Sequence, residues 1–183
     1  FRMLAENDNG IEITLEANPN SITLAHLKDL KNLGINRLSF GIQSFHEKHL
    51  KTLERIHSPQ QAEKSVHLAY SAGFENVNLD FIFGIPGQTL EEFKKDIERA
   101  ISLNPPHLSA YQLAVPSSNR LYASLPPEED VAEMYEWLMN HLPSSGYAQY
   151  EVSAFAKRDA QCQHNLKYWR LDDFLENLTK SLL

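Results

Sequence analysis

The chain has 183 residues, of which 42% are hydrophobic, and this is enough for one substantial core. Its net charge is −7, and the Lys and Arg residues are scattered along the sequence, so a nucleic-acid partner is not expected. The one cysteine, Cys162, excludes a disulfide framework and any metal site built from several thiolates of this chain.

Three features of the sequence bear on the location of the protein. No apolar run approaches the ~20 residues that a membrane-spanning helix needs, and no signal peptide is visible. A single thiol suits a reducing compartment. We therefore expect a cytoplasmic protein. The chain begins at Phe1 rather than at a Met, which leaves a longer upstream sequence open.

The first 115 residues alternate between β-rich runs and segments with helical periodicity. The expected strands are Ile11–Glu16, Arg37–Ile42, Asn76–Phe83 and His107–Leu113. Apolar residues at helical spacing follow each of the first three runs. This alternation is typical of parallel strands joined by crossover helices, so the sequence predicts an α/β fold.

Helix boundaries can be placed from capping residues. Ser44 with Glu47, and Thr89 with Glu92, each have the spacing of a capping box. Ser58 followed by a proline predicts a third helix start. These residues indicate where three of the helices begin.

The pattern changes near residue 116. Two prolines precede a helix that carries Val131, Met134 and Leu138, and an aromatic, polar stretch follows it at Tyr147–Trp169, before a helical tail. We interpret residues 1–115 as one α/β unit and residues 116–183 as an appended region that packs against it.

Polar side chains occur near the ends of the predicted strands, notably Glu16, Gln43 and Asp80. Ligands of parallel α/β sheets bind at the carboxyl ends of the strands, so these residues predict one shared site. Structural explanations compete with this one. Glu16 could pair with Arg37 or Arg55, and a buried Asp80 could have a private partner.

Three segments together resemble the oxygen-independent coproporphyrinogen III oxidase-like family of radical S-adenosylmethionine (SAM) proteins. They are Leu15–Pro19, Arg37–Phe45 and Asn78–Thr89. The resemblance implies a partial TIM-like (β/α) radical SAM barrel, here with its third to sixth strands, and an appended C-terminal helical region. It also implies that SAM contacts Glu16, and that a neighbouring nucleoside pocket is lined by Gln43, Arg55, Asp80 and the backbone around Ala114.

The chain departs from this family in one respect. The CxxxCxxC motif that holds the family's [4Fe–4S] cluster is absent, and Cys162 alone cannot replace three thiolates. No metal ligands are therefore expected in this chain. Either the motif lies upstream of residue 1, or the barrel has lost the chemistry.

The later sequence resembles the heme-chaperone branch of the family, in which an HNxxYW signature is typical. The matching residues are His164, Asn165, Tyr168 and Trp169. The resemblance implies heme or a porphyrin as a ligand and an acceptor hemoprotein as a partner. Two structural explanations remain open. The aromatic residues could anchor the appended region, and His164 could be a hydrogen-bonded structural histidine instead of an iron ligand.

Three functions follow from these observations. The first is a heme chaperone built on a radical SAM scaffold, and the second is the oxidase that decarboxylates coproporphyrinogen III. The third is a barrel without a cluster that serves as a binding domain, so enzymatic activity is left open. His107 and His57 are expected to be ordinary loop histidines.

Overall fold

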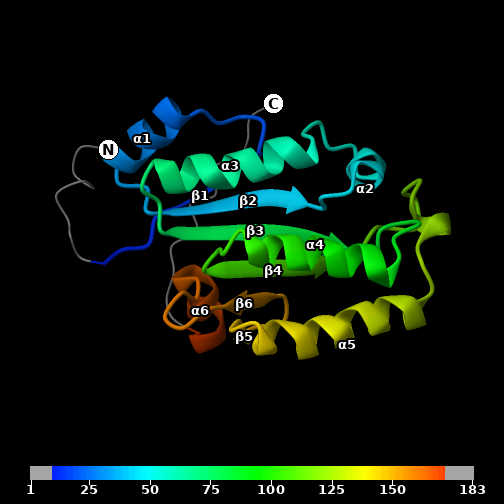
Figure 1. Ribbon diagram of the computed structural model, residues 1–183. Helices are drawn as coiled ribbons and strands as arrows, with labels where there is room; N and C mark the ends of the chain where they lie inside the picture. Colours follow the sequence, from blue (N-terminus) through cyan, green and yellow to red (C-terminus); the bar gives the residue numbers. More distant parts are fainter. Residues whose placement is uncertain (1–9, 172–183) are drawn as a thin grey trace.

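The computed structural model describes residues 10–171, and its centre is a six-stranded sheet with the order β1-β2-β3-β4-β6-β5 (Figure 1). The strands β1 (Thr14–Ala17), β2 (Arg37–Gln43), β3 (Asn76–Phe83) and β4 (His107–Gln112) are parallel neighbours. The four predicted strands and the α/β class are confirmed, although β1 begins three residues later than the predicted run.

Crossover helices join these strands and cover one face of the sheet. They are α1 (Leu24–Asn32), α3 (Pro59–Ser71) and α4 (Leu90–Ser102), with the short α2 (Glu47–Thr52) preceding α3. Helix α5 (Glu128–Ser144) follows the one-turn η1 (Tyr122–Ser124) and packs beside α4. Among the described helices, none has the length and apolarity required to cross a membrane.

The capping residues explain two helix starts and correct a third. Ser58 caps α3 and Thr89 caps α4, each in a complete capping box. The capping box predicted at Ser44 and Glu47 is wrong. His46 is the N-cap of α2, without a side-chain bond, because the Ser44 hydroxyl donates instead to the buried carboxylate of Asp96 at 2.6 Å.

The two faces of the sheet differ in chemistry. Along β3, Val77, Leu79 and Phe81 are fully buried in the core under the helices, whereas Asn78 and Asp80 alternate with them on the other face. Parallel strands in α/β proteins are usually apolar on both faces. The polar inner face of this sheet is therefore a surface for water or a ligand rather than a packed interior.

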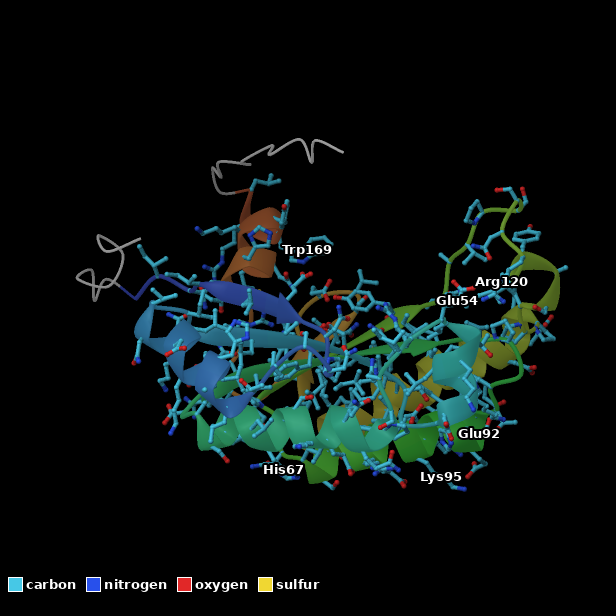
Figure 2. The ribbon with its side chains drawn as sticks, turned by 90° about the horizontal axis from the view of Figure 1, so that it is seen from above. Glu54, His67, Glu92, Lys95, Arg120 and Trp169 are labelled. Carbon is cyan, nitrogen blue, oxygen red and sulfur yellow. The ribbon has the colours of Figure 1, made fainter. Side chains whose placement is uncertain are left out.

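The appended region extends the same sheet. Strands β6 (Ala154–Ala156) and β5 (Ala148–Gln149) add to it in antiparallel orientation, with β6 next to β4. These two strands were not predicted. Helix α6 (Gln163–Arg170) lies on the face opposite α3 and α4 (Figure 2). The predicted helical tail after α6 lies outside the described residues.

Candidate functional site

The polar inner face of the sheet forms the floor of an open pocket of about 810 Å³. This volume is within the range of small-molecule sites. The walls come from the β-strand ends, the segment after α2 and the start of α6. The pocket is lined by Thr14, Glu16, Ala17, Asn18, Arg37, Ser39, Gly41, Gln43, Arg55, Asn78, Asp80, Ile82, Ser109, Tyr111, Cys162, His164 and Asn165.

Strand register explains why these side chains converge. Glu16 lies beside Ser39, Ser39 beside Asn78, and Asn78 beside His107, so one row of polar residues crosses β1 to β4. Asp80 lies in the next row, opposite Gly41 and Ser109. Residues paired in parallel register point to the same face, and the sheet therefore presents these polar groups together.

Four of the five residues predicted for the SAM and nucleoside pocket line this pocket, namely Glu16, Gln43, Arg55 and Asp80. For three of them, Glu16, Gln43 and Arg55, no side-chain hydrogen bond or ion pair is formed with any other residue in 10–171. The pairing of Glu16 with Arg37 or Arg55 that competed with a ligand role is thus not formed. The nearest carboxylate to Arg37 is instead Glu12, with 3.9 Å between Nε and Oε2.

Gln43 has an unusual backbone conformation. Its φ of 67° lies in the left-handed region, which non-glycine residues rarely adopt, and the ladder between β2 and β3 shifts register there. Its amide folds back over Gly41, where an added Cβ would lie 2.7 Å from the Gln43 Nε2 atom. The glycine is therefore required for this placement of the Gln43 side chain in the pocket.

Asp80 is held by its neighbours on the sheet. One carboxylate oxygen accepts from the Ser39 hydroxyl and the other from the Asn78 amide, both at 2.7 Å. Each oxygen of an ionised carboxylate can accept a further bond. A private structural contact thus exists, but it leaves acceptor capacity toward the pocket.

Helix α6 forms the wall at the amino-terminal end of the strands. The Glu12 carboxylate accepts from the Gln163 backbone at 2.9 Å and, more weakly, from the His164 backbone at 3.4 Å and the Cys162 thiol at 3.3 Å. A carboxylate at this position also compensates the positive end of the helix dipole. Burial raises the pKa of the Cys162 thiol, so it is not an activated thiolate.

The four HNxxYW residues separate into two groups. His164 and Asn165 line the pocket, whereas the Tyr168 and Trp169 side chains are 44% and 60% exposed. Trp169 projects from α6, away from the helix-covered face (Figure 2). Tyr168 packs edge-on against the His164 ring at 4.9 Å. The proposed anchoring of the appended region by Trp169 finds no support in its exposure, since Phe155 and Tyr147 are the buried aromatic contacts.

Two residues differ from expectation. Ala114 is exposed, two residues beyond β4, and is not part of the pocket lining. His107 is not a loop histidine, because it begins β4 and is fully buried among polar partners. A period-two pattern of polar residues along β4 (His107, Ser109, Tyr111) was the signal that could have placed it on the inner face.

Sequence comparison identifies the class of protein that this sheet and pocket represent. Residues 1–100 match the family model of the radical SAM superfamily. The chain belongs to that superfamily.

Comparison with individual proteins narrows the class to particular relatives. The chain is 46% identical over 168 residues to the heme chaperone HemW of Escherichia coli (strain K12), covering 90% of this chain and 44% of that protein. It is 39% identical over 180 residues to the heme chaperone HemW of Bacillus subtilis (strain 168), with coverages of 94% and 48%. The chain thus spans less than half the length of these relatives.

A solved structure supports the fold. Coproporphyrinogen III oxidase (HemN) from Escherichia coli, a radical SAM enzyme, superposes with a TM-score of 0.75 at 28% identity, over 87% of this chain and 38% of that one. The predicted partial TIM-like barrel is confirmed by this match.

Proposed function

We propose that the full-length protein is a heme chaperone of the radical SAM superfamily, which binds SAM in the inner-face pocket. The observation that carries this proposal is the difference in identity, 46% with a HemW protein against 28% with the HemN oxidase. A cytoplasmic location and delivery of heme to an acceptor hemoprotein belong to the same proposal.

The pocket chemistry fits SAM. Glu16 and Asp80 offer carboxylate acceptors for the ribose hydroxyls or the ammonium group, and Arg55 offers a planar fork for the carboxylate. Gln43 adds an amide that has no partner among the described residues. Glu16, Gln43 and Arg55 are present without competing side-chain contacts among the described residues, and Asp80 keeps acceptor capacity beside its bonds from Ser39 and Asn78.

The [4Fe–4S] cluster does not fit these residues. Cys162 is the one cysteine in the 183 residues, and the described residues contain no His, Cys, Asp and Glu group suited to a metal ion. We therefore assign the cluster to another part of the full-length protein. Together with SAM it would supply a 5′-deoxyadenosyl radical.

SAM binding tests the pocket directly. In the full-length protein, Glu16→Gln and Asp80→Asn should each weaken SAM binding about tenfold or more by calorimetric titration, since each removes a charged acceptor worth about 1.5–3 kcal/mol. Glu98→Gln on the exposed outer surface of α4 is the matched variant and should bind normally. Equal affinity for all variants would exclude this site for SAM.

We place the heme contact at the α6 wall, with His164 as the proposed iron ligand and Asn165, Tyr168 and Trp169 nearby. His164 is exposed beside the pocket, and neither ring nitrogen has a hydrogen-bond partner among residues 10–171. An imidazole whose nitrogens form no hydrogen bond, next to exposed aromatic rings, is suited to a flat iron porphyrin.

Absorbance titration with heme tests this assignment. His164→Ala should shift the Soret band and weaken heme binding at least tenfold in the full-length protein. His67→Ala, an exposed histidine of α3 on the opposite face (Figure 2), should leave both unchanged. Identical spectra for the wild type and His164→Ala would show that another residue binds the iron.

The structural match to HemN favours coproporphyrinogen III oxidation as the second candidate function. Anaerobic incubation of the reconstituted full-length protein with coproporphyrinogen III and SAM separates the two. We expect no protoporphyrinogen IX, and its formation would establish the oxidase. A full-length sequence without a cysteine triad would instead leave a binding domain without a cluster.

A further inference from the structure

A continuous chain of hydrogen bonds crosses the inner face from the appended region to the pocket. The Tyr150 hydroxyl lies 2.6 Å from His107 Nε2, and His107 Nδ1 lies 2.6 Å from the Asn78 carbonyl oxygen. The Asn78 amide then donates to Asp80 at 2.7 Å. Three side chains thus connect the appended region with a carboxylate of the proposed SAM site.

The direction of this chain can be assigned from its two ends. At one end, the Tyr150 hydroxyl accepts from the Cys162 backbone N–H and from the Asn165 amide, both at 3.2 Å. With both lone pairs engaged, the hydroxyl donates its one proton to His107 Nε2. The remaining ring proton is then on Nδ1.

The other end requires the same direction. Asp80 accepts at both oxygens, so the group of Asn78 that faces it must be the NH₂ group. The Asn78 carbonyl then faces His107 and also accepts from the Ser109 hydroxyl at 3.1 Å. A carbonyl cannot donate, and Nδ1 of His107 must therefore carry the proton.

Burial keeps this arrangement unambiguous. His107 is fully buried and Asn78 is 2% exposed, so water does not compete for their bonds. Loss of hydration lowers the pKa of His107 to about 3, and the ring is neutral with a single proton at physiological pH.

We propose that Tyr150, His107 and Asn78 form a positioning relay through which Asn165 and the start of α6 orient the Asp80 carboxylate toward its ligand. Tyr150, His107 and Asn165 are positioning residues in this relay. Within it they affect the SAM ligand only through the orientation of Asp80. The inference rests on the proposed SAM site, because Asp80 is the group that it orients. It also gives Asn165 of the HNxxYW signature a role apart from heme.

The ligand chemistry follows from the geometry. With one bond from Ser39 and one from Asn78, each Asp80 oxygen keeps a further acceptor site. Two fixed acceptor sites side by side suit a ligand with a pair of neighbouring donors, such as the two hydroxyls of a ribose.

Tyr150→Phe removes only the hydroxyl and tests the relay in the full-length protein. With ¹⁵N-labelled histidine, NMR should show His107 protonated at Nδ1 in both proteins, because the Asn78 carbonyl oxygen still accepts there. The Nε2 signal should shift in the variant, because Nε2 loses the hydrogen bond from Tyr150. SAM binding should weaken about five- to tenfold. Tyr122→Phe, an exposed tyrosine of η1, should change neither quantity.

A double substitution separates the relay from a general structural effect. In His107→Asn, a short amide donor replaces Nδ1 but no longer reaches Tyr150, so adding Tyr150→Phe should change the SAM Kd less than twofold. A full additional loss in the double variant would overturn the relay. A His107 proton on Nε2 in the wild type would do the same.

The experiment also distinguishes this inference from the proposed function. The His107 Nε2 ¹⁵N shift and the Asp80 carboxyl ¹³C shift are measured without SAM, and both should respond to Tyr150→Phe. If they respond while the wild type does not bind SAM, the proposed function fails and the relay stands. If SAM binds and neither signal responds, the relay is wrong.

Discussion

At the scale of single residues, one buried carboxylate, Asp96, stabilises the loop that follows β2. Asp96 of α4 is 1% exposed and accepts from the Ser44 hydroxyl and the Phe45 backbone N–H, both at 2.6 Å. These two residues directly follow Gln43, whose left-handed backbone needs support from its surroundings. The loop that presents Gln43 is thus fixed from the far side of the sheet.

The burial of Asp96 predicts a specific pH dependence. Burial raises its pKa from 3.8 to about 6, against the opposing effect of its hydrogen bonds and of His46. A carboxyl with a raised folded pKa stabilises most at low pH, and this contribution decreases as pH rises. The stability advantage of wild type over Asp96→Asn should therefore fall between about pH 4 and pH 6 and level off above.

Urea denaturation of both proteins across this pH range measures the difference, in which titrating groups that do not interact with Asp96 cancel. Glu92 does interact with Asp96, but despite its partial burial its pKa is lowered to about 2 by hydrogen bonds from Lys48 and the Thr89 backbone, so it stays ionised in the folded wild type across this range. Parallel stability curves for the two proteins would show that Asp96 does not titrate in this window.

Sequence reasoning placed residues correctly where the signal was local. Glu16, Gln43 and Asp80 were assigned from their positions on strands, and the pocket brings them together, while their contact with a ligand stays a prediction. The role of Ser44 was missed because its partner is 52 residues away. His107 was missed for a similar reason, since its partners Asn78 and Tyr150 come from other parts of the chain.

At the scale of elements, capping residues determine where the helices begin. Thr89 caps α4 by accepting from the Glu92 backbone N–H at 3.3 Å, and the Glu92 side chain accepts from the Thr89 N–H at 3.1 Å. The same carboxylate contacts Lys48 and His49, which joins α2 to α4. The cap therefore serves both a helix end and a contact between helices.

Loss of this cap should be measurable. Thr89→Ala should lower the free energy of unfolding by about 1 kcal/mol, because a helix N–H loses its acceptor. Thr89→Ser retains the hydroxyl and should cost much less, and Ser58→Ala at α3 should resemble Thr89→Ala. Chemical denaturation provides the comparison, and an unaffected Thr89→Ala protein would mean that water replaces the hydroxyl at no cost.

Sequence patterns were reliable for long elements and weak for short ones. The bounds of β3 were predicted as observed, because polar and apolar residues alternate over 76–81 and two further apolar residues complete the run. Strands β5 and β6, of two and three residues, were not foreseen. Their position depends on pairing with β4, which no local pattern encodes.

At the scale of the whole molecule, the appended region is part of one hydrophobic core. Three of its side chains are at most 1% exposed and belong to the same cluster as Phe81 of β3. They are Leu138 of α5, Phe155 of β6, and Tyr147, which precedes β5. β6 also pairs with the edge of β4. The predicted division at residue 115 remains a prediction. These contacts show that residues on both sides of it share one core and one sheet.

A truncation tests whether the two parts fold independently. A protein ending at residue 115 should aggregate or bind the dye ANS, because it exposes the edge of β4 and the core surface that α5 and β6 cover. A protein ending at residue 171 retains these elements and should be monodisperse by light scattering. A folded, cooperative 1–115 protein would establish two autonomous domains.

The attachment of α6 affects how a molecule enters and leaves the pocket. No side chain of α6 is buried, and its start is held by polar contacts to Glu12 and Tyr150. Detaching this helix would break those contacts without exposing the core. Ligand exchange would then depend on a local opening with a small free energy, so residence times could be tuned by substitutions at one helix end while the melting temperature stays nearly constant.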